Sequence, residues 1–327
     1  MWGKRHRVTG SRGSAPHDGC GRSWHGLRGP TEDVAAIFSS PHIRLFTGAI
    51  LISFSPVFVR LVDVSPTTSG FYRVFIGGIA LAAFIIVTGR RITFSVRVWR
   101  ILVASAVFFA LDLWFWHRSI VFIGPGLATL LANLQVFFMM AAGVVFLGQR
   151  PSLIQIVAIP LAVLGLYLIV GSDWQAPIPN YQAGVWLGVL TAISYAGYML
   201  CMRAARLGAA HAVPMREVAV MSLMVSVVLA VSAVAEGESL AVTTLPDVGW
   251  LLAYGLLAHA IGLMFIASSL ADVTTTEAGL ALLLQPSLSF LWDILFFGRD
   301  VSPIEAAGAA LTLLAIYLGS RVRSKES

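Results

Sequence analysis

The chain has 327 residues, of which 57% are hydrophobic and only 12% are charged, and its mean hydropathy is +0.83. A soluble protein carries roughly 25% charged residues, so the composition excludes a soluble globular protein and predicts one embedded in a membrane. The net charge of +6 does not indicate a nucleic-acid partner, because Lys and Arg collect in the N-terminal segment and in a few loops, as in membrane proteins.

The N-terminal segment, residues 1–42, is polar and rich in Gly, Arg, Ser and His. It has no apolar core of the kind found in secretory signal peptides, and its acidic residues, glycines and prolines disfavour an amphipathic targeting helix. We expect either a disordered cytoplasmic tail or an extension that results from an over-long gene start. Residues 321–327 are expected to form a short cytoplasmic tail at the other terminus.

Ten apolar stretches follow, each close to the roughly 20 residues that a helix needs to cross a bilayer. Most prolines lie between the stretches or at their starts, where a helix tolerates them. Pro56, Pro160 and Pro286 lie inside stretches and are expected to kink or locally open them. The stretches are Ile43–Val62, Thr67–Thr88, Val98–Phe115, Pro125–Leu147, Leu153–Gly171, Gly184–Ala204, Glu217–Ala235, Val248–Leu270, Thr275–Phe297 and Ile304–Ser320.

The basic residues predict the orientation in the membrane. If the N-terminus is cytoplasmic, the cytoplasmic segments contain most of the Lys and Arg, and the opposite side has only Arg60, Arg118 and Arg299. Because positive charge accumulates on the cytoplasmic side, we expect both termini to be cytoplasmic, in a multi-pass protein of the cell inner (plasma) membrane.

One segment of the chain occurs twice. Gln135–Tyr167 aligns on Gln285–Tyr317 without a gap, and Gly148 then matches Gly298. Five helices per half is an odd number, so the second half must have inverted topology. Inverted repeats are typical of secondary transporters, whose substrate site lies near the membrane midplane between the halves. The expected fold is therefore an all-α membrane protein with ten transmembrane helices in two inverted five-helix repeats.

Specific motifs resemble the EamA branch of the drug/metabolite transporter superfamily over Ile43–Ser320. They are SPTTSGFYRVFIGG with Pro66 and Arg73, FFALDLWFWHRSI at Phe108–Ile120, and LALLLQPSLSFLWDILFFGRD at Leu280–Asp300. The resemblance implies one repeat at residues 43–171, a second at 184–320, and a carrier that moves small metabolites, often outward. The family usually has a proline in the middle of the fourth and ninth helices, and this chain has only Pro286. It also departs from the family's acid after the terminal glycine, with Gln149 and Arg299.

Charged residues at membrane depth cost about 2.5–3.5 kcal/mol each to insert, so they are candidates for function. Arg73, Asp112, His117 and Asp293 are all expected in the outer third of their helices and therefore in one layer. This layer predicts a substrate site that recognises a zwitterion or an ion. The alternatives are a structural ion pair of Arg73 with Asp112 or Asp293, and a position of His117 at the membrane interface.

Amides and aromatic residues complete the candidate site. Gln135 and Gln285 are related by the repeat and lie near the midplane, where an amide either bonds across helices or lines a polar cavity. His259 is a further candidate, with a helix–helix hydrogen bond as the alternative. The aromatic residues suit either an interfacial belt or a cavity wall. Those retained as candidates are Trp116, Tyr198 and Trp292.

We therefore expect a secondary transporter that exports small metabolites, such as amino acids or related polar compounds, by alternating access. Protons are a candidate coupling ion through Asp112. The alternative is a membrane receptor or scaffold that binds a small ligand without moving it. The sequence has no HExxH, GxSxG or P-loop motif, so no enzyme, cofactor or metal site is expected. The expected partners are the substrate, the lipid bilayer and protons, without nucleic acid, and a homodimer is one option for assembly.

Overall fold

A computed structural model gives the fold of this protein and describes residues 40–320, apart from residues 90, 172, 176, 206–214, 270–271 and 274. In the described residues the regular structure is helical, and ten spans are long and apolar enough to cross a membrane. This confirms the expected fold class. The expected N-terminal tail lies outside the described residues except for residues 40–42, and the expected C-terminal tail, residues 321–327, lies wholly outside them.

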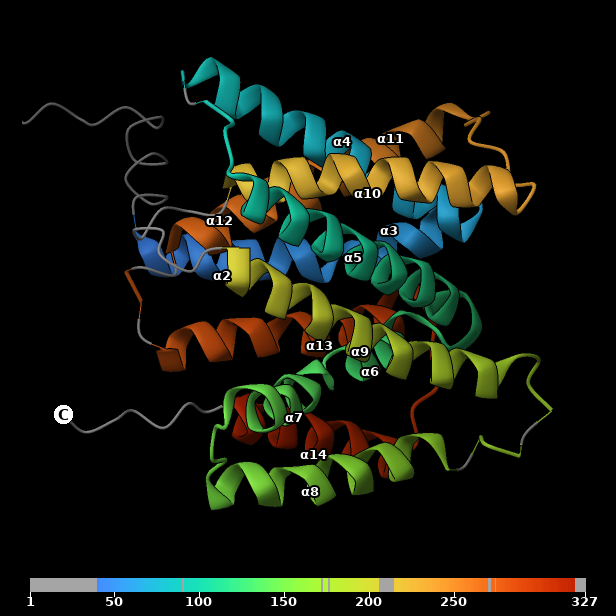
Figure 1. The fold of residues 1–327 in the computed structure, drawn as a ribbon. Coiled ribbons are helices and arrows are strands. Elements are labelled where there is room, and N and C mark those ends of the chain that lie inside the picture. The colour runs from blue at the N-terminus through green and yellow to red at the C-terminus, as the bar shows by residue number, and fades with distance from the viewer. Residues whose placement is uncertain are drawn as a thin grey trace, which may run out of the picture. The chain divides into compact units, whose positions relative to one another are not determined.

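The ten crossings divide into two sets of five, and Figure 1 shows their arrangement. The first five are α2 (Pro41–Ser53) with α3 (Ser55–Leu61), α4 (Pro66–Val87), α5 (Val96–Ile123), α6 (Pro125–Ala132) with α7 (Gln135–Leu147), and α8 (Leu153–Val170). The second five are α9 (Tyr181–Ala205), α10 (Met215–Ala235), α11 (Leu245–Ala253) continued by the π-helix η1 (Tyr254–Ile261) and α12 (Gly262–Ser269), α13 (Thr275–Phe297), and α14 (Pro303–Ser320).

The two repeats share the same backbone at the glycine turn. Gly148 and Gly298 have left-handed φ angles of 61° and 62°, a conformation that glycine adopts without steric cost. In both turns the amide of the next residue bonds to the carbonyl six residues earlier. These bonds are Gln149 N–H to Gly143 O at 3.0 Å and Arg299 N–H to Asp293 O at 3.4 Å.

The helix that follows each glycine turn starts with a reciprocal cap. The Ser152 hydroxyl accepts from the amide of Gln155, whose side chain accepts from the Ser152 amide. Ser302 and Glu305 make the same two bonds at the start of α14. Such caps satisfy amides that a helix start leaves free. The internal repeat detected in the sequence therefore extends to the backbone bonds of the glycine turn and to the cap of the helix that follows it.

The packing of the helices also follows a twofold relation between the halves. The most extensive interfaces are α5 with α9, α8 with α14, α4 with α10, and α2 with α12. We number the crossings one to ten along the chain and replace each by its equivalent in the other repeat, five places away. The pairs 3–6 and 8–1 then exchange places. Pairs 2–7 and 5–10 map onto themselves, and Figure 1 shows α4 beside α10 and α8 beside α14. The interfaces thus lie between the repeats rather than within them.

The third crossing is longer than expected. The apolar run predicted an end at Phe115, but α5 has 28 residues and continues to Ile123. The polar residues that end the apolar run are bonded inside the protein: His117 to the carbonyl of Leu113, and Ser119 to the carbonyl of Gly184. Because these groups have partners, the helix can continue where hydropathy alone predicts that it stops.

The prolines inside the apolar stretches predicted some of the helix breaks but not all of them. The first crossing is interrupted at Phe54, next to Pro56, as expected. However, α8 and α13 continue as helices through Pro160 and Pro286, so neither is interrupted there, and the alternative of a kink at these prolines stays a prediction.

The fourth crossing breaks without a proline, at residues 133–134, between α6 and α7. The amide and the side chain of Asn133 both donate to the carbonyl of Thr129, at 3.2 and 2.8 Å. The next amide, that of Leu134, bonds to the carbonyl of Leu131, three residues earlier, so the helix tightens here into a 3₁₀-type turn.

The contact between α8 and α14 yields a prediction. A Cβ added to Gly165 would lie 2.7 Å from the carbonyl oxygen of Gly308, closer than real contacts allow, whereas one added to Gly249 on α11 would meet nothing within 4 Å. We expect Gly165→Ala to cost about 1–3 kcal/mol of stability by overpacking. Gly249→Ala should be neutral, or stabilising by up to about 1 kcal/mol, because alanine favours helices. Thermal unfolding in detergent measures both, and equal midpoints would contradict the close packing of α8 on α14.

Candidate functional site

A polar group inside the bundle is built around Arg73, on α4. Its Nη1 donates to the hydroxyl of Tyr254 on η1 at 3.2 Å. Its guanidinium carbon lies 5.4 Å from the ring centre of Trp116 on α5 and 5.2 Å from that of Tyr254. Contacts between a guanidinium and aromatic faces are favourable and stronger where water is excluded. Three crossings therefore hold one cationic side chain in place.

Tyr254 joins Arg73 to His117 through a directional chain of hydrogen bonds. The carbonyl of Leu113 can only accept, so the Nδ1 of His117, 2.7 Å away, carries the hydrogen. In the neutral ring, Nε2 then accepts from the Tyr254 hydroxyl at 3.2 Å, and that hydroxyl accepts from Arg73. His117 is fully buried. It is therefore part of this buried polar group, and its contact with a substrate stays a prediction.

Arg73 and Asp112 remain without partners of opposite charge. Among the described residues neither forms an ion pair, although the two are close enough to interact electrostatically. Asp112 is only 5% exposed, and its carboxylate accepts no hydrogen bond from the described part of the chain. It lies eleven residues before the end of α5, about 16 Å along the helix, so it is deeper than the outer third expected. The structural ion pair considered from the sequence does not form.

Aromatic rings surround the inner part of this group. Tyr198 on α9 is 8% exposed, and its ring centre lies 4.6 Å from Phe109 and 5.2 Å from Tyr195. Both tyrosines lie within electrostatic range of Asp112 and Arg73. Tyr198 is thus close to the charged pair, as a wall residue would be, and it is buried and does not lie in an interfacial belt.

His259 lies five residues after Tyr254 on the same π-helix. Its Nε2 is 2.8 Å from the hydroxyl of Ser222 on α10, and its buried Nδ1 has no partner among the described residues. One nitrogen therefore makes the helix–helix bond considered from the sequence, and the other is unsatisfied. π-helices often occur at functional sites because the extra residue re-aims side chains. Tyr254 was missed in the sequence analysis, and its spacing from His259 was the only available signal.

Asp293 is bonded to other parts of the chain than Arg73, and its position in the same layer as Arg73 stays a prediction. It accepts from the amide of Gly126 at 3.0 Å, near the start of α6, and lies 3.6 Å from Arg299. Arg299 also contacts Glu305 at 3.3 Å. In the described residues no hydrogen bond or ion pair joins Asp293 to Arg73. Its charge is balanced by a helix start and by an arginine on the adjacent turn.

The remaining candidates lie on other helices. Gln135 starts α7, and its buried Oε1 has no partner among the described residues; Gln285 on α13 is half-buried and has no hydrogen bond in the same set. Trp292 donates to the hydroxyl of Ser53 at 3.0 Å and stacks on Phe54 at 4.7 Å, beside the break in the first crossing. Contact of these three side chains with a substrate stays a prediction.

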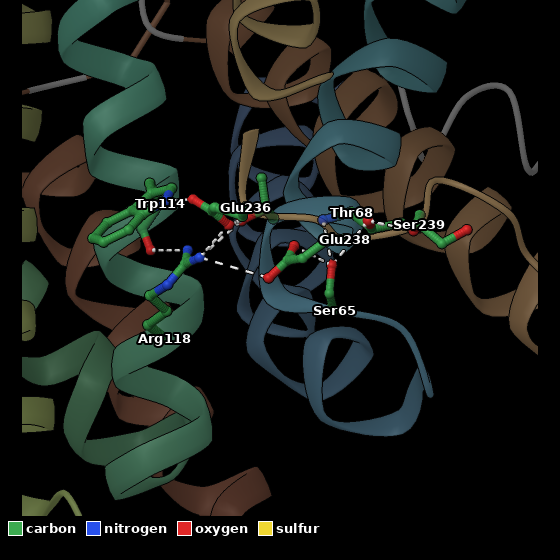
Figure 2. A network of polar contacts seen from close by, with 8 residues as sticks. Ser65, Thr68, Trp114, Arg118, Glu236, Glu238 and Ser239 are labelled. Carbon is green, nitrogen blue, oxygen red and sulfur yellow. Dashed lines mark hydrogen bonds and ion pairs between the residues drawn. The ribbon is translucent and has the colours of Figure 1, made fainter. Parts of the chain in front are cut away.

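A second polar group lies at the end of the bundle nearest Arg73 (Figure 2). We call it the Arg118 network. The guanidinium of Arg118 lies 3.8 Å from the ring centre of Trp114 and donates to Glu236 at 2.6 Å and to Thr67 at 3.0 Å. Glu238 lies 3.7 Å from Arg118. The network comprises Ser65, Thr67, Thr68, Trp114, Arg118, Glu236, Glu238 and Ser239.

Glu236 is the best-bonded carboxylate of the Arg118 network. Burial by itself would raise its pKa, but hydrogen bonds from Trp114 and Thr67 and the charge of Arg118 outweigh burial. The pKa of Glu236 is therefore below its ordinary value of 4.5. Hydrogen bonds to the charged form and a nearby cation both favour ionisation.

Comparisons with known proteins bear on the family and the fold of this chain. A family model described as the EamA-like transporter family matches residues 40–171 and 182–321. No curated protein sequence matches the chain. A solved structure described only as "Crystal structure of protein" is 20% identical, with a TM-score of 0.61 over 86% of this chain and 96% of that chain. At that identity the likeness shows the fold alone.

The bonds of Tyr254 generate a prediction for stability. Tyr254→Phe removes the hydroxyl that bonds both Arg73 and His117 and leaves two buried groups unsatisfied. We expect a loss of about 1–3 kcal/mol, measured by thermal unfolding in detergent. Tyr167→Phe is the matched control, because Tyr167 is 69% exposed. Equal effects of the two substitutions would show that the chain from Arg73 to His117 contributes no stability.

The lowered pKa of Glu236 predicts a pH dependence of stability. A carboxyl group with a lower pKa in the folded state contributes stability above its unfolded pKa and loses it as pH falls through the folded pKa. We expect Glu236→Gln to be less stable than the unmodified chain near neutral pH. The difference should shrink below about pH 4.5. Melting midpoints over this range test it, with the exposed Asp63→Asn as control, and a gap that does not change with pH would contradict it.

Proposed function

Because the chain belongs to the EamA-like transporter family, we propose that it is a secondary carrier that moves small zwitterionic metabolites, amino acids among them, by alternating access. The chain is a multi-pass membrane protein of a transporter family. The proposal adds the substrate class and places the binding site at Arg73 and Asp112, between α4, α5 and η1.

The observation that carries the proposal is a cation held inside the bundle without an anion. Arg73 is fixed by Tyr254 and Trp116, yet no carboxylate of the described residues pairs with it. A charge at membrane depth without a counter-charge is costly, and such residues mark substrate pathways. A substrate carboxylate would supply the missing partner, in the bidentate geometry that favours arginine over lysine.

Asp112 supports a zwitterion over a simple anion. Its buried carboxylate has no hydrogen bond or ion pair in the described part of the chain. Arg73 and Asp112 together carry no net charge, so a substrate with one carboxylate and one ammonium group would satisfy both without adding charge to the membrane. Phe109, Tyr195 and Tyr198 would then face the rest of the substrate and suit an apolar side chain.

The proposal includes a direction and a location. With both termini cytoplasmic, the Arg118 network lies on the side opposite the cytoplasm, in the inner (plasma) membrane. A carrier closed at that end loads substrate from the cytoplasm, which is the order of events in an exporter. We place proton coupling at Asp112, since a carboxylate that binds a proton in one state and the substrate ammonium in the other would link the two movements.

Counterflow in proteoliposomes tests this function. The panel consists of the standard amino acids, with their N-acetyl and methyl-ester derivatives as probes that lack one charge. Arg73→Gln should weaken exchange of the free amino acid by about 10- to 100-fold, as expected for losing a hydrogen bond to a charged group. It should affect the methyl ester much less. Asp112→Asn should show the same selectivity between the amino acid and its N-acetyl derivative.

The same counterflow assay provides the controls and the results that would contradict the proposed function. Arg60→Gln and Asp63→Asn change exposed charges and should leave exchange intact. Equal losses for the free and the blocked substrates would contradict the zwitterion site. Thermal stabilisation by an amino acid without any counterflow would indicate a receptor instead of a carrier. Proton coupling fails if Asp112→Asn leaves the pH dependence of flux between about pH 5 and pH 9 unchanged.

A further inference from the structure

The Arg118 network connects the two repeats at one end of the bundle (Figure 2). Thr67 on α4 and Arg118 on α5 belong to the first repeat, whereas Glu236 and Glu238 follow α10 in the second. The side chain of Arg118 is 16% exposed, and those of the two glutamates are 27% and 22% exposed. These charges are largely shielded from water, so they would regain hydration if the repeats separated here.

The twofold relation places a counterpart of this network at the opposite end. There the start of α10 meets the loop between α4 and α5, just as the start of α4 meets the loop after α10 at the Arg118 end. In the described residues the counterpart contains one bond, from Arg216 Nη1 to the carbonyl of Arg91 at 3.3 Å, and no ion pair. In the described residues, ion pairs therefore hold the Arg118 end together, whereas a hydrogen bond from a guanidinium to a backbone carbonyl is what joins the two repeats at the counterpart.

A polar stripe leads from the network to the candidate site. Ser65, Ser69 and Arg73 are spaced by four residues on α4 and therefore share one face. Ser65 belongs to the Arg118 network and Arg73 to the candidate site, about 12 Å further along the helix. Ser69, between them, is 1% exposed, and its buried hydroxyl has no partner among the described residues. Ser69 is therefore a buried polar position between the two groups, where a reporter can test for a path.

The network and the site are also adjacent along both helices that they share. Arg118 follows His117 directly on α5, and Tyr72 precedes Arg73 on α4. Tyr72 donates to the carbonyl of Leu240, in the loop that carries the two glutamates, at 2.8 Å. A movement of α5 relative to this loop would therefore disturb the Arg118 network and the bonds of His117 together.

We propose that the Arg118 network is the gate of the substrate path at this end, and that its ion pairs break and re-form once in each transport cycle. This inference rests on the proposed function, because a gate implies a substrate path. Arg118 acts by holding α5 against the loop after α10, so it is a gating residue that does not touch substrate. The gate covers the Arg73 site when the network is intact.

The labelling of a buried cysteine tests the gate without knowledge of the substrate. Cys20 and Cys201 are replaced by serine, Ser69→Cys is the reporter, and a membrane-impermeant charged methanethiosulfonate is added to proteoliposomes. Labelling should be slow with the intact network. Glu236→Gln should speed it by about fivefold, the change in an open–closed equilibrium expected from losing one partly exposed ion pair, and Arg118→Gln, which removes the pairs with both glutamates, should speed it at least as much. The exchanged pair Arg118→Glu with Glu236→Arg should restore slow labelling.

Matched variants keep the test interpretable. Arg60→Gln removes an exposed arginine that forms no ion pair in the described residues and should not change the labelling rate. If the exchanged pair does not fold, Arg118→Cys with Glu236→Cys, cross-linked by a short bifunctional methanethiosulfonate, replaces it. Cross-linking should stop counterflow, and reduction should restore it.

Failure of the gate and failure of the proposed function give different results. Labelling of Ser69→Cys that is equally slow with and without Arg118, or continued counterflow after cross-linking, would overturn the gate even in an active carrier. Absence of counterflow in the unmodified chain would overturn the proposed function, whereas the labelling rates would still report whether the Arg118 network closes this end.

Discussion

Inside the hydrocarbon layer no water is present to bond a polar group, so each such group must find its partner within the protein. Most described groups do so. Asn133 bonds to its own helix, Trp292 to Ser53, and Asp293 to the start of α6. Among the described residues, some of the groups without such a partner lie at the proposed site or on the proposed path to it: the charges of Arg73 and Asp112, the Nδ1 of His259 and the hydroxyl of Ser69. Others lie elsewhere in the bundle, such as the hydroxyls of Ser55, Thr129 and Tyr181 and the Oε1 of Gln135.

The inverted repeat provides a reference against which each half can be compared. The two glycine turns have the same backbone bonds, yet the positions joined by those bonds differ in charge. The turn in the second half pairs Asp293 with Arg299, whereas the first half has Gly143 and Gln149 at these positions. Charged bonds thus reinforce one turn and neutral groups the other. The same asymmetry separates the Arg118 network from its counterpart at Arg216.

The proposed recognition site and the proposed gate are built on the same two helices. On α4, residues spaced by four connect the Arg118 network to Arg73. On α5, His117 belongs to the candidate site, and its neighbour Arg118 belongs to the Arg118 network. The π-helix η1 supplies Tyr254, which completes the chain of bonds from Arg73 to His117. A carrier needs its binding site to respond to the state of its ends, and a short rigid connection through two helices meets that need.

The sequence by itself determined the class of protein, the ten crossings and the inverted repeat. Hydropathy and charge act locally along the chain, because every crossing must satisfy the membrane through its own residues. For the same reason the sequence identified Arg73, Asp112, His117 and His259 as costly polar residues. Only the tertiary structure decided their partners: Tyr254 for Arg73 and His117, Ser222 for His259, and no residue of the described part of the chain for Asp112.

The tertiary structure also decided where two crossings depart from their apolar runs. Bonds from His117 and Ser119 allow α5 to continue past the point where its apolar run ends, and the fourth crossing is interrupted at residues 133–134 although it has no proline there. The partner of a polar side chain depends on which helices meet in space, and these helices lie far apart in the chain. A single sequence does not show which helices meet.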